Sequence, residues 1–225
     1  MTWRMHELAL AKSGFTQVPD VLRSHECENI AACAVPSSAP SGGTRSLLLQ
    51  DCCKSLVTRL RNHPDLSKLI PLEFAAVQCT YFEKSASRNW LVPLHQDLSI
   101  PVAKPVKHPS LRGWSQKEGR FFVQAPVELL EQLVAVRLHL DPCGPQDGPL
   151  RVLPGTHLRG RIESPAARKA IAEVACNAER GSALVMRPLL LHASSKSSGL
   201  SRRRVLHFLF GPRHLPHGLE WPHVV

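Results

Sequence analysis

From residue 74 onward the sequence is a succession of short apolar runs with the composition of β-strands. In the run 133–140, aliphatic residues occupy every second position, while Arg137 and His139 point to the opposite face. No internal repeat is visible. The runs cover residues 74–82, 90–100, 133–140, 149–153, 183–191 and 203–210. Many short strands behind N-terminal helices predict a mainly β fold with flanking helices, built on a jelly-roll barrel.

The first third of the chain has mostly helical patterns. A strand is expected over 14–19, after a short N-terminal segment, and Asp20 is a candidate cap for a helix that reaches Cys33. Apolar residues recur at helical spacing over 44–62, which predicts a helix that packs on a sheet. Further helical segments are expected at 64–70, 127–132 and 165–176, and a loop at 36–43.

A chain of 225 residues fits one domain, 1–225. We expect residues 1–73 to form a mostly helical scaffold and residues 74–210 to form the jelly-roll core. Within this core, the segment 101–126 is basic, rich in Pro and Gly, and without clear periodicity. Such a stretch in a compact domain is either a functional lid or a passive, mobile loop, and both interpretations stay open.

Composition narrows the class of protein. Hydrophobic residues make up 43% and charged residues 20%, which is typical of a globular chain. The seven Cys form no Cys-x-x-Cys pair, and no apolar leader precedes them, which favours a reduced cytoplasm and disfavours Cys-bound zinc. No apolar run is long enough to span a bilayer, so no membrane partner is expected.

The net charge of +10 suits a nucleic acid, an anionic surface or an anionic small molecule. No helix-turn-helix, zinc-finger or RNA-binding signature supports the first option. A single Tyr and seven Phe spread through strands also lack the alternation of aromatic and basic residues that single-stranded nucleic acids require. The alternative is an ordinary solvated basic surface.

The motif His95-Gln96-Asp97 carries the clearest chemistry. On a strand, residues two apart project from one face about 6.5–7 Å apart at Cα, so this imidazole and carboxylate can converge on one ion. A third ligand is expected from His192, which directly follows the apolar run 189–191. Two His and one carboxylate are the ligand set of non-haem Fe(II) oxygenases, although zinc remains open from the ligands alone.

Three segments together resemble the phytanoyl-CoA dioxygenase family. Residues 93–98 (Pro-Leu-His-Gln-Asp-Leu) resemble its first ligand strand. Residues 148–157 (Gly-Pro-Leu-Arg-Val-Leu-Pro-Gly-Thr-His) resemble its central signature, with Asp147 where Asn is usual. His192 followed by Ser194 resembles the distal ligand and its neighbour. The resemblance covers roughly residues 74–210 and implies a double-stranded β-helix.

The resemblance also implies the cofactors and their contacts. Fe(II) would be bound by His95, Asp97 and His192, with 2-oxoglutarate as cosubstrate and O2 as oxidant. Arg203 fits the family position for the arginine that binds the far carboxylate of 2-oxoglutarate, and Arg202 or Arg204 is the fallback. Ser194 is expected to add a hydroxyl contact, and Trp114 to close the cosubstrate pocket.

The function expected from this resemblance is an Fe(II)- and 2-oxoglutarate-dependent dioxygenase that hydroxylates an unactivated C–H bond of a small, anionic organic substrate. The alternative is a non-catalytic, cupin-like metal-binding module, which would not need a buried Arg203. Gln78, Arg137 and His139 are further candidates for the cavity wall, each with a purely structural alternative. His157 ends the Pro-Gly-Thr-His turn, where a structural role suffices.

Overall fold

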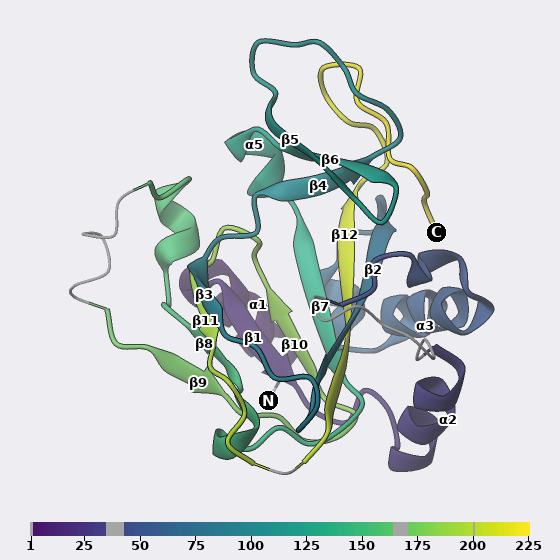
Figure 1. The fold of residues 1–225 in the computed structure, drawn as a ribbon, viewed down its shortest axis with the longest axis vertical. Helices are drawn as coiled ribbons and strands as arrows, with labels where there is room; N and C mark the ends of the chain where they lie inside the picture. The colour runs from purple at the N-terminus through teal and green to yellow at the C-terminus, as the bar shows by residue number, and fades with distance from the viewer. Residues whose placement is uncertain (1, 35–42, 164–170, 200) are drawn as a thin grey trace.

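Two antiparallel β-sheets form the body of the protein (Figure 1). The computed structural model describes residues 2–34, 43–163, 171–199 and 201–225. The larger sheet has the strand order β1 (Phe15–Val18), β10 (Ala183–Met186), β7 (Val134–His139), β12 (Arg203–Pro212) and β2 (Phe74–Lys84). The smaller has the order β3 (Val92–His95), β11 (His192–Ser194), β8 (Leu150–Val152) and β9 (Val174–Cys176). This arrangement confirms the double-stranded β-helix expected from the sequence.

Helices cover the outer face of the larger sheet (Figure 1). They are α1 (Trp3–Ser13), α2 (Ser24–Ala34), α3 (Asp51–Asn62) and α4 (Leu66–Leu69), with a 3-10 turn, η1 (Leu47–Leu49), before α3. Among the described residues, no helix has the length and apolar character needed to cross a membrane. Residues of these helices pack against the larger sheet and bury one of its faces.

Two apolar cores follow from this layering. The first lies between the helices and the larger sheet and includes Leu56, Leu60, Phe208 and Phe210. The second lies on the other face of that sheet and includes Leu209, together with residues of the smaller sheet such as Val152. Burial of a large apolar side chain contributes about 1.5–3 kcal/mol, so both faces of the larger sheet are held strongly.

The pairing of β2 with β12 decides which residues face the inside of the β-helix. In β12, Leu206, Phe208 and Phe210 face the helices, so the alternate residues face inward. The register shifts between Leu209 and Phe210, where Val77 of β2 is the extra residue of a β-bulge. Beyond the bulge, four residues of β2 line the inner cavity: Gln78, Thr80, Phe82 and Lys84.

The segment 101–126 is not irregular, and this part of the sequence prediction is wrong. It contributes to a third, three-stranded sheet with the order β4 (Ser99–Val102), β6 (Arg120–Gln124) and β5 (Arg112–Lys117). In β4, Pro101 has no backbone N–H to donate, and a register shift between Arg112 and Ser115 interrupts β5. These features interrupt the alternation of apolar and polar residues that marks a strand in the sequence.

Other boundaries differ from expectation. Residues 3–13 form α1, a helix that the sequence did not predict, because only His6 and Leu10 of this segment are buried. Asp20 does not cap α2, which begins at Ser24. The helix expected over 44–62 is divided at Gln50, and Thr44 instead makes a β-bridge to Tyr81.

The expected C-terminal elements are mostly present. The turn at 127–132 contains α5 (Val127–Leu130), and the 3-10 turns η2 (Pro145–Asp147) and η3 (Thr156–Arg159) flank β8. The helical insertion expected at 165–176 is wrong for its last part, because residues 174–176 form β9. Residues 164–170 lie outside the described residues.

Candidate metal centre

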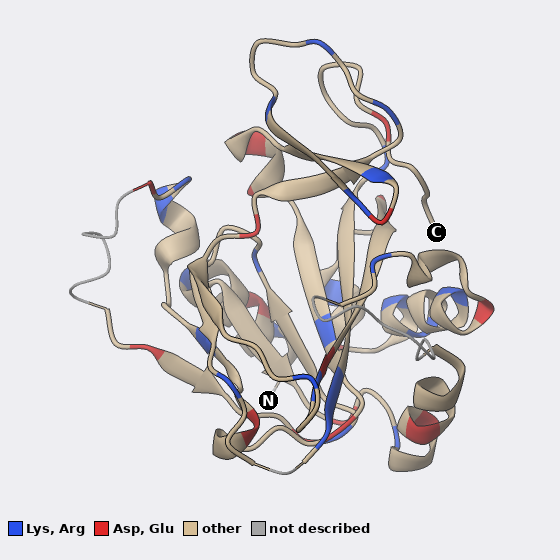
Figure 2. Ribbon diagram, viewed as in Figure 1, with Lys and Arg blue, Asp and Glu red and all other residues tan. Residues whose placement is uncertain are grey.

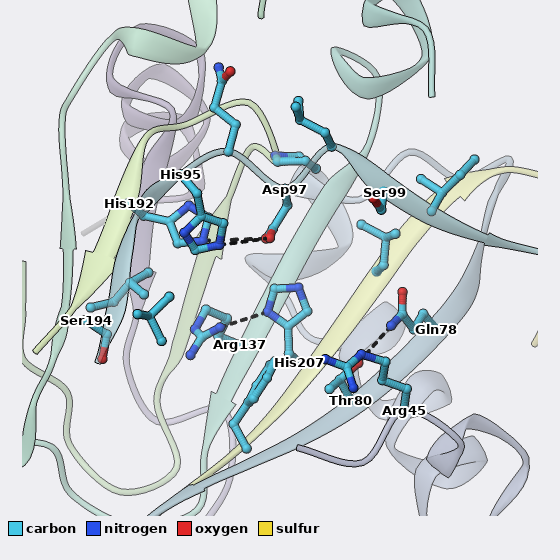
Figure 3. Close-up of a pocket in the computed structure, with 18 of the residues that line it drawn as sticks. Arg45, Gln78, Thr80, His95, Asp97, Ser99, Arg137, His192, Ser194 and His207 are labelled. Carbon is cyan, nitrogen blue, oxygen red and sulfur yellow. Dashed lines mark hydrogen bonds and ion pairs between the residues drawn. The ribbon is translucent and has the colours of Figure 1, made fainter. Parts of the chain in front are cut away.

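His95, Asp97 and His192 meet at the inner edge of the smaller sheet (Figure 3). His95 ends β3 and His192 begins β11, and the two residues are direct partners in the antiparallel pair. Their Nε2 atoms lie 3.5 Å and 3.6 Å from the two carboxylate oxygens of Asp97. One ligand atom from each residue lies within 4.8 Å of the others, and among the described residues no other His, Cys, Asp or Glu cluster does this.

Backbone hydrogen bonds orient both imidazoles toward Asp97. Nδ1 of His95 is 2.8 Å from the carbonyl oxygen of Pro93, and Nδ1 of His192 is 2.8 Å from that of Leu190. A carbonyl only accepts, so each Nδ1 carries the proton. Each Nε2 is thereby left as a lone-pair donor, which is the tautomer that binds a divalent metal.

The electrostatics of the cluster keep its carboxylate ionised. Removal from water raises the pKa of Asp97, but the neighbouring imidazoles of His192 and His95 outweigh it and hold that pKa far below its usual range. Burial lowers the pKa of His192, which favours its neutral form. Burial lowers the pKa of His95, but the hydrogen bond and charge of Asp97 outweigh it and raise that pKa, so His95 gives up a proton when a metal binds. An ionised carboxylate with two imidazoles is the donor set that suits Fe(II).

A cavity of about 390 Å³ opens beside the three residues, between the two sheets. Its wall is strongly basic: the lining includes Arg45, Lys84, Lys117, Arg137 and Arg203. Among the described lining residues, Asp97 is the only acid. Figure 2 shows Lys and Arg on strands of the larger sheet as well as on the outer loops. The cavity therefore suits ligands that bring negative charge with them.

Arg203 and Ser194 lie together in this cavity, as expected. Ser194 is two residues along β11 from His192, so its side chain is on the same face. Its hydroxyl donates to the carbonyl oxygen of Gly148 at 3.0 Å. Arg203 is 4% exposed and donates through Nη1 to the same carbonyl, while its Nε is buried without a partner.

Lys84 completes this group, and the sequence prediction missed it. Its Nζ donates to the Ser194 hydroxyl at 2.5 Å and to the backbone carbonyl of Ser195. Burial and the charge of Arg203 lower the pKa of Lys84 to about 8. The predicted strand ended at residue 82, whereas β2 continues to Lys84, so the available signal was the continued alternation from Gln78.

Gly148 makes this group possible through its backbone. Its φ of +63° is a conformation that favours glycine, and an added Cβ would lie 2.5 Å from the backbone oxygen of Ser195. Any side chain here would displace the carbonyl that both Arg203 and Ser194 contact. The backbone conformation and the contact with Ser195 thus explain why glycine stands at the start of the Gly-Pro-Leu segment.

The neighbouring arginines are occupied elsewhere. Arg202 makes a two-pronged ion pair with Glu83, at 2.8 Å and 3.2 Å. Arg204 does the same with Asp141, at 2.7 Å for both contacts. Strand alternation places both on the face of β12 opposite Arg203. Arg203 is therefore the member of the triplet that lines the cavity.

Two of the three candidate wall residues also line the cavity. Gln78 lies on β2 and donates to Thr80 at 2.9 Å. Arg137 lies on β7 beside His207, a cavity residue that the sequence prediction did not single out (Figure 3). His139 is buried but lies outside the lining of this cavity.

Trp114 and His157 lie away from the centre. Trp114 lines a separate hollow with Leu111 and Pro105, and it is not among the residues around the metal cluster. His157 contacts the backbone oxygen of Ala11 at 3.2 Å and packs against Gly14, where a Cβ would lie 2.5 Å from its Nδ1. His157 thus joins η3 to α1, which supports its structural role.

The β5–β6 hairpin borders the outer part of the cavity. Lys117, near its tip, lines the cavity and lies 5.1 Å from the ring centre of Phe122. Its neighbour Glu118 pairs with the guanidinium of Arg45 at 3.1 Å and accepts from the Arg45 backbone N–H at 2.8 Å. The hairpin tip is thus tied to the segment before η1.

Comparison with known proteins identifies the family. The family model for phytanoyl-CoA dioxygenase matches residues 47–205, which is most of the chain. The chain belongs to the phytanoyl-CoA dioxygenase family. No curated protein matches it.

Solved structures share the fold of this family member at low sequence identity. The epimerase SnoN in complex with Fe3+, α-ketoglutarate and nogalamycin RO is 14% identical, with a TM-score of 0.70, covering 96% of this chain and 87% of that one. The carbocyclase SnoK from nogalamycin biosynthesis is 15% identical, with a TM-score of 0.67, covering 94% and 86%. HygX from Streptomyces hygroscopicus, with nickel and 2-oxoglutarate bound, is 15% identical, with a TM-score of 0.62, covering 95% and 89%.

The residues present fit the cofactors of the phytanoyl-CoA dioxygenase family. Two imidazole Nε2 atoms and a carboxylate suit iron, and the buried, unpartnered Nε of Arg203 suits a carboxylate in the same cavity. Family and site together give an iron- and 2-oxoglutarate-dependent oxygenase class of activity. O2 is the oxidant expected for this class.

Proposed function

We propose that this protein is a hydroxylase, which uses Fe(II), 2-oxoglutarate and O2 to hydroxylate an unactivated C–H bond of a small anionic organic molecule. The observation that carries the proposal is one cavity with a two-His, one-carboxylate cluster and five basic side chains on its wall. A non-catalytic metal-binding module has no use for such a charge excess beside the metal.

In this proposal His95, Asp97 and His192 bind the iron through one face of its coordination sphere. The two carbonyl contacts at Nδ1 hold the imidazoles in the binding tautomer before the metal arrives. Three ligands leave three positions open on an octahedral ion. When bound, iron(II), 2-oxoglutarate and O2 supply oxidising power, and the 2-oxo acid leaves as succinate and CO2.

Arg203 and Ser194 would bind the carboxylate of 2-oxoglutarate that is remote from the metal. A guanidinium forms paired, charge-assisted hydrogen bonds with a carboxylate, which orient as well as attract it. Lys84 adds a second positive charge at the same place. Ser194, already fixed by Gly148, would offer its hydroxyl oxygen to the same neighbourhood.

The positive charge of the cavity lining exceeds what 2-oxoglutarate can neutralise, which favours an anionic substrate. 2-Oxoglutarate brings two negative charges, while the lining contains five basic residues and one acid, before the metal is counted. One of the five, Arg45, is already paired with Glu118. Lys117 lies on the hairpin that borders the cavity, and burial and the charge of Arg45 lower its pKa. A carboxylate or phosphate group on the substrate would offset this excess.

The test is cosubstrate turnover by the iron-loaded protein. Succinate formation is measured without substrate and then with a panel of small carboxylates, phosphates, amines and neutral compounds matched in size. We expect anionic members to stimulate succinate release, and a product heavier by one oxygen atom to appear in equal amount by mass spectrometry.

The control for this test is Asp97→Ala, which removes one ligand without changing the basic wall. We expect it to release no succinate. Stimulation by neutral compounds alone would contradict the anionic substrate class. Stimulation with a product that has lost hydrogen, or changed only stereochemistry, would contradict hydroxylation.

A further inference from the structure

Arg137 is a buried cation without an acidic partner among the described residues. It lies in the middle of β7, is 8% exposed and lines the cavity. Its Nη1 donates to Nδ1 of His207 at 3.1 Å, and its Nε is buried with no partner. In the described part of the chain, no carboxylate forms a salt bridge with it.

The contact with His207 does not neutralise this charge. Burial, followed by the charge of Arg137, lowers the pKa of His207 to about 3, so its imidazole is neutral and accepts the hydrogen bond. Burial and the charge of Arg203 lower the pKa of Arg137 to about 10, which still leaves it protonated at neutral pH. A buried charge without a counter-ion is costly, so this site is built to receive an anion.

Arg137 lines the cavity together with the metal ligand Asp97 and with Arg203. Its guanidinium interacts with the positive charge of Arg203 and with the negative charge of Asp97. Figure 3 shows Arg137 on the same side of the metal cluster as Ser194, beside His207. Asp97 itself is engaged with His95 and His192, so it is not free to pair with Arg137.

When a 2-oxo acid binds a metal, one oxygen of the carboxylate next to its keto group is not coordinated. The acid chelates through its keto oxygen and one carboxylate oxygen, and the second carboxylate oxygen then needs a donor. Arg203, Ser194 and Lys84 already surround one place for a carboxylate, farther along β11. Two cavity cations interact with the charge of the metal ligand Asp97, Arg137 and Lys117. Arg137 is buried and Lys117 is exposed, so Arg137 is the donor available to the second place.

On the basis of the proposed function, we propose that Arg137 binds the metal-proximal carboxylate of the 2-oxo acid, and that His207 is the positioning residue that fixes its guanidinium. Each of two cations then binds one end of the cosubstrate: Arg203 binds the remote carboxylate, and Arg137 binds the carboxylate next to the keto group. The division predicts that each arginine responds to a different part of the ligand.

Two probes separate these roles. 2-Oxoglutarate has both carboxylates, and 2-oxobutyrate has the same keto acid end without the remote carboxylate. Dissociation constants are measured on the full chain loaded with Zn(II), which avoids turnover, by calorimetry for 2-oxoglutarate and by saturation-transfer NMR for 2-oxobutyrate. Zinc content is determined for every variant, so that only metal-loaded proteins are compared.

We expect Arg137→Gln to weaken binding of both probes by a similar factor, about ten- to a hundredfold for a lost charge-assisted contact. The matched control, Arg203→Gln, should weaken 2-oxoglutarate and leave 2-oxobutyrate unchanged. His207→Asn, which keeps an acceptor near the Nδ1 position, should bind both probes nearly as the parent does. His207→Phe, which removes the acceptor, should bind both more weakly.

Several results would overturn the assignment. If Arg137→Gln weakens 2-oxoglutarate alone, Arg137 serves the remote carboxylate. If it changes neither dissociation constant, its anion comes from the substrate or its role is structural. If the metal-loaded parent does not bind 2-oxoglutarate at all, the proposed function fails, and this assignment fails with it.

Folding is controlled with two further variants. Arg137→Lys keeps the charge but not the forked donor, and should show an intermediate loss for both probes if Arg137→Gln does not fold. Arg137→Met removes an unpaired buried cation, so the metal-free variant should melt at the same or a higher temperature than the parent. A clear drop in its melting temperature, with unchanged affinities in Arg137→Lys, would assign Arg137 a structural role instead.

Discussion

Lys84 and Arg203 are direct partners across the β2–β12 pair, and both side chains are buried on the cavity side. Side chains directly opposite in an antiparallel pair have Cβ atoms about 4.5–5.5 Å apart, and like charges at that distance destabilise the sheet. Burial, together with the charge of Arg203, lowers the pKa of Lys84 to about 8. The pair is thus a buried contact between like charges, which a carboxylate bound beside it would stabilise.

This relation predicts proton uptake when 2-oxoglutarate binds above pH 8. In the free protein Lys84 is largely neutral there, and a carboxylate beside it favours the protonated form, which raises its pKa. Calorimetry in two buffers of different ionisation enthalpy should show uptake of up to one proton between about pH 8 and pH 10. Lys84→Met should show none, and equal uptake in parent and variant would contradict a role for Lys84 in this site.

The same shift predicts a pH dependence of stability for the metal-free protein. The folded pKa of Lys84 is about 8 against a usual value of 10.5, so between these limits the unfolded chain binds more protons. Stability of the parent relative to Lys84→Met should therefore rise with pH across that window. Urea denaturation of both proteins at pH 7.5 and pH 10 measures the change, and a constant difference would contradict the lowered pKa.

Metal occupancy should depend on all three ligands. Removing one imidazole leaves two protein donors, so His95→Ala and His192→Ala should retain little iron after desalting, as measured by elemental analysis. His25→Ala, at an exposed position on α2, is the matched control and should keep the parent's iron content. Full iron content in both ligand variants would refute the ligand assignment.

The arginine triplet should divide into one binding residue and two structural ones. Loss of a paired contact at Arg203, at about 1.5–3 kcal/mol per charged hydrogen bond, should raise the dissociation constant for 2-oxoglutarate about a hundredfold or more in Arg203→Gln. Arg204→Gln leaves the buried carboxylate of Asp141 without its paired guanidinium and should cost stability instead. Weaker cosubstrate binding in Arg204→Gln, with none in Arg203→Gln, would show that the register is misread.

Electrostatic attraction of an anionic substrate should come from Lys117 rather than from the rest of segment 101–126. Lys117 lines the cavity, whereas exposed Lys104 pairs with Glu220 at 3.3 Å. Lys117→Gln should therefore reduce kcat/KM for an anionic substrate at 0.1 M salt. The loss should shrink toward 1 M salt, where the Debye length falls from about 10 Å to about 3 Å.

The control for Lys117 is the triple variant Lys104/Lys107/Arg112→Gln, which removes more charge from the same segment but leaves the cavity wall intact. It should keep kcat/KM close to that of the parent at both salt concentrations. If the triple variant and not Lys117→Gln loses efficiency, attraction works through the outer surface of the segment.

The sequence predicts the metal cluster well because its signals are local. The two-residue spacing of His95 and Asp97 already places both on one face of the chain, and alternation around Arg203 separates it from Arg202 and Arg204. For Lys84, alternation from Gln78 gives only the face of the strand, and His207 carries no comparable local signal. Their approach to the site depends on which strands pair and in which register, and those pairings join residues more than a hundred positions apart.

The missed strands of segment 101–126 have a related cause. Pro101, Gly113 and several basic residues lower the intrinsic strand signal, and β4, β5 and β6 are held by one another and by buried Ile100 and Phe122. Trp114 was expected near the cosubstrate because the family resemblance implies an aromatic residue at about this distance along the chain from Asp97. Once β5 forms, its side chain lines a different hollow.

The bulge at Val77 separates two tasks within one strand. Before it, Phe74 and Ala76 point toward the helices; after it, the row from Gln78 to Lys84 points into the cavity, and Val77 absorbs the change of phase. Without the bulge, strict alternation from Ala76 through Val77 would turn Gln78 and its row, Lys84 included, outward while Arg203 stayed in place. The two halves of β2 are therefore under different constraints: packing on the helices restricts the first half, and the shape and charge of the cavity restrict the second.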